Sequence, residues 1–228
     1  MNFGELTVKR ASLAVLFLSL MAATASQPAS ADTLFTTLGP GGSYSLGGWA
    51  VTGSNYGSSV EGNFFTLGSS ADISDAILAL SYIQGDNAAI HLSIESDNGG
   101  SPGSVLATLT QVGTIPPLIL GDSFIGGGLV TFTCSGVACD LAAGHYWLVA
   151  SETDPTAVQD WMQTYNGATT NLAQSSGGGS WIINPGYAET AFQIDGSSSA
   201  PTPEPSSLLL LGSGLAGLAS LIKRKLMA

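Results

Sequence analysis

The positions of the basic residues divide this chain into two ends and a middle. All five lie near the ends, at Lys9, Arg10, Lys223, Arg224 and Lys225. The stretch from 32 to 202 has no Lys or Arg but fourteen carboxylates, so it carries a charge of about −14 at neutral pH. Such a surface repels nucleic acid and anionic lipid, and its simplest role is to keep an exported domain soluble.

Calcium is the one cofactor that this composition leaves open. Clustered carboxylate and carbonyl oxygens are the ligands that Ca²⁺ prefers. Asp86-Asn87 and Asp97-Asn98 lie at two predicted turns, but neither follows an EF-hand pattern or a repeat. We therefore predict no metal site from these residues.

Residues 1–31 have the three parts of a secretory signal peptide. Lys9 and Arg10 end a basic n-region, and residues 11–23 form an apolar segment that is too short to span a bilayer comfortably. Ala29-Ser30-Ala31 supplies the small-x-small cleavage site. We expect signal peptidase to cut after Ala31.

The other end is predicted to be a linker followed by a membrane-spanning helix. Residues 197–205 are rich in Ser and Pro, which keeps them out of a packed core. The uncharged run 206–222 covers about 25 Å as a helix, enough to cross a thin inner membrane. The basic cluster Lys223-Arg224-Lys225 should stay in the cytoplasm, which places residues 32–202 outside it.

The string PEPSSLLLLGSGLAGLASLIKRK closely resembles the PEP-CTERM sorting signal of Gram-negative bacteria that make exopolysaccharide. It has Pro203-Glu204-Pro205, a Gly-containing apolar helix and a basic cluster, although Lys supplies two of the three cations where Arg usually dominates. The resemblance implies cleavage near the Pro-Glu-Pro motif by an exosortase, a membrane cysteine transpeptidase-like enzyme. The protein would then be released or transferred to the cell surface. An ordinary transmembrane anchor is the alternative.

Residues 32–196 are predicted to fold as an all-β sandwich or jelly roll. Short apolar runs recur between clusters of Gly, Asp, Asn and Pro. In residues 90–95 the alternation places Ile90, Leu92 and Ile94 on one face of a half-buried strand. The other strands are expected at 63–67, 76–83, 105–111, 129–133, 146–151, 158–165 and 191–195. About eight to ten strands at this spacing favour a sandwich over a barrel.

A second resemblance concerns this middle part. The segment ILALSYIQGDNAAIHLSIESDNGGSPGSVLATLT, with LAAGHYWLVAS downstream, looks like the choice-of-anchor R domain, a bacterial surface domain found with different anchoring tails. The resemblance covers residues 34–195. It implies a strand pair, a Gly-Pro-Gly-type turn and a later strand with Tyr146-Trp147, but no ligand or activity.

Cys134 and Cys139 are the only cysteines. An even pair this close in an exported protein is expected to form a local disulfide. A metal pair is the alternative, although no His or third Cys stands nearby.

We expect no enzyme activity. Residues 99–103 match the G-x-S-x-G nucleophile elbow, but Pro102 lacks the N–H that would form half of the oxyanion hole, and the flanks predict strand-turn-strand. His91 and His145 are the only histidines, and no cation in the ectodomain could stabilise an oxyanion. Asp75 with Glu152 could hydrolyse glycosides in principle, but no spacing selects that pair.

Two functional hypotheses follow. The first is an exported surface or extracellular-matrix protein, processed at its tail, non-catalytic and associated with exopolysaccharide. The alternative is a lectin-like module that binds sugar through exposed aromatic side chains, with or without calcium. Trp161 and Trp181, which are flanked by polar residues and Gly, are the candidate ligand residues.

Overall fold

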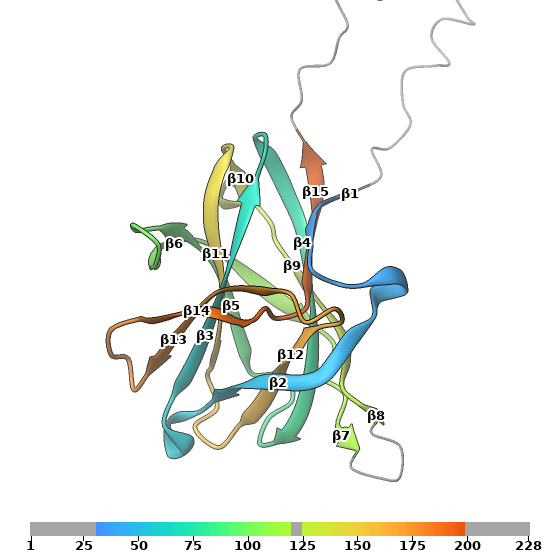
Figure 1. Cartoon of the computed structure of the whole chain (residues 1–228), viewed down its shortest axis with the longest axis vertical. Helices are drawn as coiled ribbons and strands as arrows, with labels where there is room; N and C mark the ends of the chain where they lie inside the picture. The colour runs from blue at the N-terminus through green and yellow to red at the C-terminus, as the bar shows by residue number, and fades with distance from the viewer. Residues whose placement is uncertain (1–30, 120–124, 199–228) are drawn as a thin grey trace, which may run out of the picture. The chain divides into compact units, whose positions relative to one another are not determined.

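The structure is a computed structural model that describes residues 31–119 and 125–198 (Figure 1). Its first strands are β1 (Asp32–Thr36), β2 (Tyr44–Thr52), β3 (Ser59–Leu67), β4 (Ala71–Gln84), β5 (Ile90–Asp97), β6 (Pro102–Val112), β7 (Leu118–Ile119) and β8 (Ile125–Gly126). The later strands are β9 (Gly128–Thr133), β10 (Asp140–Leu141), β11 (Gly144–Glu152), β12 (Val158–Thr164), β13 (Thr169–Ser176), β14 (Ile182–Ala188) and β15 (Phe192–Ser198). Three short 3-10 helices, η1 (Pro40–Gly42), η2 (Ser54–Tyr56) and η3 (Val137–Cys139), complete the described elements.

The strands form two layers that are joined through β6. One layer contains β1, β15, β4 and β9 together with β10, β12 and β2, and the other contains β5, β11, β3, β13 and β14. The first part of β6 pairs with β5, and its last residues, 110–112, pair with β9. All pairings between these strands are antiparallel, and the sheet is open, with β1 at one end of the strand order and β14 at the other. The short hairpin β7–β8 forms a separate two-stranded sheet.

The main core lies between the two layers. Leu78, Phe132 and Phe192 come from the first layer, and Phe65 and Leu148 come from the second. Strand β5 places Ile90, Leu92 and Ile94 in this core, as its pattern predicts. The expectation of a half-buried strand is wrong, because Ser93 and Glu95 on the other face are buried as well. The predicted all-β, sandwich-like architecture is confirmed.

Each expected strand overlaps an observed strand, but only 129–133 and 158–165 agree to within one residue at both ends, and most observed strands are longer than expected. The sequence pattern missed β1, β2, β13 and β14, together with the two-residue strands β7, β8 and β10. Strand β15 also continues to Ser198, two residues past the expected end of the ectodomain, because Ser197 and Ser198 pair with Asp72 and Ala71 of β4.

Both ends of the ectodomain lie side by side. Strand β1 pairs with β15, and Asp32 lies opposite Gly196 (Figure 1). The predicted signal peptide, the Pro-Glu-Pro motif and the basic tail lie outside the described residues. Within residues 31–119 and 125–198 no helix is long and apolar enough to cross a membrane.

Candidate functional site

A chain of polar side chains links the surface to a buried carboxyl group on β3. Asn184 Nδ2 donates to Gln174 Oε1 at 2.8 Å, and Gln174 Nε2 donates to Glu61 Oε1 at 3.1 Å. Ser59 Oγ donates to the same oxygen at 3.1 Å. Glu61 is 0% exposed, and its Oε2 has no hydrogen-bond partner among the described residues. Burial raises the pKa of Glu61 to about 7, although both hydrogen bonds act to lower it.

A β-bulge in β14 places an aromatic ring on the same face as Asn184. Asn184 lies opposite Leu172 of β13, but Tyr187 lies opposite Thr170, because an extra residue interrupts the register around Gly186. Gly186 has φ +77°, a conformation that glycine adopts without strain. Leu172 and Thr170 are two residues apart and share a face of β13. Asn184 and Tyr187 therefore share a face as well.

Trp49 of β2 packs against Tyr187 from the other layer. Their ring centroids are 5.2 Å apart, and Trp49 Nε1 donates to the Ala188 carbonyl oxygen at 2.9 Å. Tyr187 is still 44% exposed, and Ile182 at the start of β14 is 64% exposed. Tyr187 and Trp49 are among the aromatic residues that the sequence offers for stacking on sugar rings, whereas Asn184 was not predicted from the sequence. Polar Ser59 and Glu61 alternate with apolar Val60. This alternation was the only local pattern that indicated a strand beside the site.

Trp161, one of the two predicted ligand residues, is fully buried. It is 0% exposed, packs against Phe192 with ring centroids 5.9 Å apart, and donates from Nε1 to the Ala191 carbonyl oxygen at 3.2 Å. It cannot offer a ring face to a ligand in this fold. The polar neighbours that suggested exposure alternate with it along β12, and Gln159 on its own side is buried as well.

Trp181 lies in a second, smaller apolar cluster on the outer face of the second layer. The cluster contains Trp147, Val149 and Ala173, with Trp181 packed partly buried against it. Trp147 Nε1 donates to Asp97 Oδ1 at 2.8 Å. Asp97, a residue of one of the two turns considered for calcium, therefore accepts a hydrogen bond from the protein itself.

The histidines and the candidate carboxylate pair are not brought together. His91 is exposed on β5, whereas His145 on β11 stacks on Phe64 with ring centroids 5.3 Å apart. Thr66 Oγ1 lies 3.0 Å from His145 Nδ1. Asp75 lies on β4 of the first layer and Glu152 at the end of β11 in the second.

Three carboxylates meet where β4 and β11 end. Asp154 Oδ2 accepts a hydrogen bond from the Asp86 backbone N–H at 2.8 Å, while both carboxylate oxygens of Glu152 are buried without a hydrogen-bond partner in the described chain. Burial, reinforced by the charges of Asp154 and Asp86, raises the pKa of Glu152 to about 8. Among the described residues no group of three or more His, Cys, Asp or Glu side chains is placed to hold a metal ion.

A surface pocket of about 400 Å³ lies at the end of the domain from which the tail departs. Asp72 of β4 and Asp140 of β10, which are paired across the strands, contribute to its wall together with Ser197 and Ser198 of β15. These two carboxylates are the charged groups of its lining.

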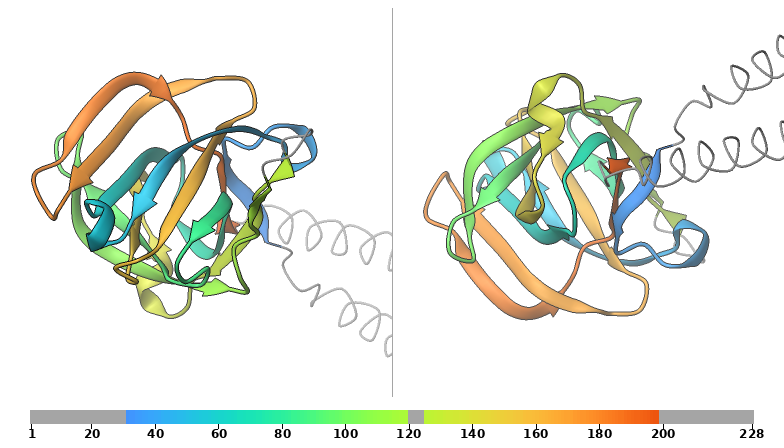
Figure 2. Two further views of the ribbon diagram at one scale, coloured as in Figure 1. Left: turned by 90° about the horizontal axis from the view of Figure 1, so that it is seen from below. Right: turned by 90° about the horizontal axis from the view of Figure 1, so that it is seen from above.

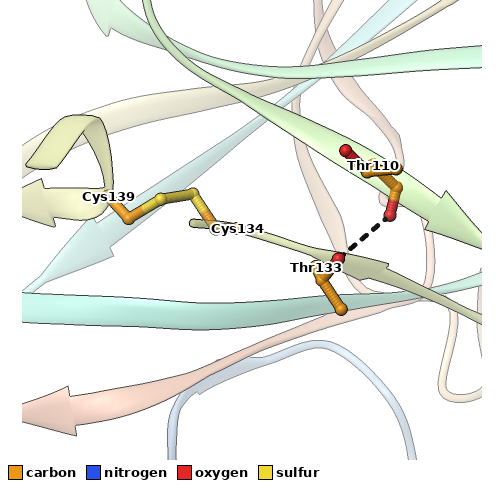
Figure 3. The surroundings of a disulfide bond; sticks show 4 residues. All are labelled: Thr110, Thr133, Cys134 and Cys139. Carbon is orange, nitrogen blue, oxygen red and sulfur yellow. Dashed lines mark hydrogen bonds between the residues drawn. A yellow bond between two sulfur atoms is a disulfide. The ribbon is translucent and has the colours of Figure 1, made fainter. Parts of the chain in front are cut away.

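Cys134 and Cys139 form a disulfide, as predicted (Figure 3). Their Cα atoms are 6.0 Å apart, and the bond joins the residue directly after β9 to the last residue of η3. Cys139 is part of the main core, and Cys134 packs against that core. The disulfide therefore attaches the short surface loop between the two cysteines to the core.

Replacing both cysteines by serine should lower the free energy of unfolding by only about 2 kcal/mol, because the closed loop is short. Urea denaturation of Cys134→Ser/Cys139→Ser beside the oxidised wild type measures this difference. The reduced wild type is the control and should lose a similar amount. Loss of cooperative unfolding in the double variant would show that the fold depends on the bond.

The chain was compared with known proteins. Residues 201–225 match the family model described as the PEP-CTERM protein-sorting motif. No curated protein and no solved structure matches the chain significantly. The match supports the sorting signal that the sequence predicts, whereas the resemblance of residues 34–195 to the choice-of-anchor R domain stays a prediction.

Proposed function

We propose that this chain is an exported, exosortase-processed surface or matrix protein whose acidic β-sandwich domain is non-catalytic and associates with extracellular polysaccharide. The observation that carries the proposal is the sorting motif at residues 201–225. The disulfide agrees with an oxidising compartment outside the cytoplasm.

The fold is compatible with a domain tethered close to a membrane. Because Asp32 pairs with Gly196, the segments before β1 and after β15 leave the domain at one place. Residues 199–205 can extend over at most about 25 Å. A tail held in the membrane would keep that end of the domain within this distance of the bilayer until the tail is cut.

The absence of catalysis is proposed from the arrangement of side chains. His145 lies against Phe64 and Thr66, and Asp97 accepts a hydrogen bond from Trp147. Asp75 and Glu152 belong to different layers. These contacts favour structural roles for the groups that were considered for chemistry.

Replacing Pro203, Glu204 and Pro205 together by alanine should stop tail removal, because the enzyme would lose its recognition motif. The variant should accumulate in the membrane fraction with its tail attached, whereas the wild-type protein is recovered without it. Gel mobility, mass and cell fractionation measure the difference.

Alanine at Ser197, Ser198 and Ser199 is the matched control, and it should be processed as the wild type is. If the wild type itself kept its tail, the chain would be an ordinary membrane-anchored protein. Normal release of the Pro-Glu-Pro variant would also contradict exosortase processing.

A further inference from the structure

We propose that the partly exposed face formed by Asn184 and Tyr187 of β14, which is turned toward Trp49 of β2 in the other layer, binds a neutral saccharide. This face, called the β14 face below, lies on the β13–β14 hairpin, orange at the side of the domain in both views of Figure 2. The proposal deepens the proposed function, because it gives the ectodomain a ligand class and a binding site.

The bulge at Gly186 supplies the first argument. Without the extra residue Tyr187 would point to the opposite side of the hairpin from Asn184, because strand side chains alternate. With it, the two side chains share a face and their partners on β13 are two residues apart, about 7 Å along the strand. Bulges commonly re-aim a side chain beside a binding site.

The hydrogen-bond chain behind Asn184 supplies the second argument. Gln174 uses its N–H to bind Glu61 and its carbonyl oxygen to accept from Asn184 Nδ2. This orientation leaves Asn184 Oδ1 and the second N–H of its amide for a ligand. A side chain fixed in this way loses little entropy on binding. An acceptor beside a donor can bind two neighbouring hydroxyl groups.

The aromatic pair supplies the apolar part of the site. The Trp49 ring packs against one side of Tyr187, and Trp49 Nε1 donates to the Ala188 carbonyl oxygen. These contacts fix the position of both rings. Tyr187 nevertheless stays partly exposed. An aromatic ring offers an apolar surface, and amide groups beside it fix orientation, which together suit a sugar ring with its C–H and hydroxyl groups.

Electrostatics selects an uncharged sugar. Residues 32–202 contain no Lys or Arg, and Glu61 lies directly behind Gln174. Uronic acids, sulfated glycans and phosphates would meet a negative potential with no cation to bind them. The β14 face is also too polar for a purely apolar ligand, because it includes the Asn184 amide, which is bound to Gln174 of β13.

Isothermal titration calorimetry of the full chain in detergent tests the proposal, with glucose, galactose and mannose hexasaccharides and an oligogalacturonate of equal length as probes. We expect at least one neutral hexasaccharide to bind and the oligogalacturonate not to bind. Tyr187→Ala and Asn184→Ala should each weaken binding about tenfold or more, because each removes a central contact. Tyr187→Phe, which keeps the ring, should retain binding.

Tyr165→Ala is the matched control, since Tyr165 is 63% exposed on the loop after β12 and lies outside the β14 face. It should bind as the wild type does, and thermal melting should show that all variants fold. Failure of every neutral probe, equal binding of the oligogalacturonate, or unchanged binding by both alanine variants would overturn the proposal. Tail processing is measured separately, so normal processing without sugar binding would refute this site alone.

Discussion

At pH 8 the Glu61→Gln variant should be more stable than the wild type, by up to about 3 kcal/mol in free energy of unfolding, whereas at pH 5 this difference should fall below about 1 kcal/mol. Glu61 is fully buried, and within residues 31–119 and 125–198 the hydrogen bonds to its carboxyl group all reach Oε1. Glutamine has the shape of the neutral acid, and its carbonyl oxygen can still accept from Ser59 and Gln174. It therefore removes the cost of ionising the side chain and keeps these contacts.

The direction in which the free energy of unfolding changes with pH follows from the direction of the Glu61 pKa shift. The pKa of Glu61 rises from 4.5 to about 7 on folding, so the neutral form contributes stability that is complete below about pH 4.5 and is lost as the pH rises through 7. Glu152 acts in the same direction, with a folded pKa of about 8. Asp154 acts oppositely, because hydrogen bonds from Thr156 and Asp86 lower its pKa, so its contribution is lost only in more acidic solution. The wild-type domain should therefore lose stability between pH 5 and pH 8.

Urea denaturation at pH 5, 6, 7 and 8 measures this dependence. Asp72→Asn, which changes an exposed carboxylate, is the control and should follow the wild-type pH profile. A wild-type domain that gained stability from pH 5 to pH 8 would contradict the account. So would a Glu61→Gln profile parallel to that of the wild type.

Trp161→Ala should destabilise the domain by about 3–5 kcal/mol, a large part of the stability of an ordinary domain. The substitution opens a cavity beside Phe192 and removes the N–H that binds the Ala191 carbonyl oxygen. Trp181→Ala is the matched comparison and should cost less than half as much, because Trp181 is only partly buried at the edge of the outer cluster.

Thermal and urea unfolding of the two tryptophan variants separate these roles. Equal losses for both, or a negligible loss for Trp161→Ala, would mean that the main core does not depend on Trp161 as the packing indicates. The comparison also tests whether Trp161 belongs to the core or to a surface that binds ligands.

The strands that could be predicted from the sequence are those with a local apolar signal. In β5 the alternation of Ile90, Leu92 and Ile94 with polar residues identifies the strand and the face that enters the main core, but not the burial of its other face. Strands β13 and β14 lack such a signal, because Gln174 and Asn184 stand on the side that faces the other layer. Their burial is decided by partners far away in the chain.

The candidate site could not be predicted from the sequence for the same reason. Glu61 looks like a surface carboxylate in the sequence, but Gln174, 113 residues later, supplies its hydrogen bond. Trp161 looked exposed because polar residues flank it, but its ring is buried in the core between the two layers, where it packs against Phe192. Gly186 is a local signal for the register shift that turns Tyr187 toward Asn184, but it does not identify the partner strand or the residues that share a face.

Intact-mass analysis of the protein recovered from the cell surface or the medium tests export and tail processing most directly. The account predicts a chain that begins at Asp32, ends near Pro203-Glu204-Pro205 and has a mass two hydrogens lower than the fully reduced chain because of the Cys134–Cys139 bond. A chain found in the cytosol with reduced cysteines and with both Met1 and Ala228 still present would contradict it.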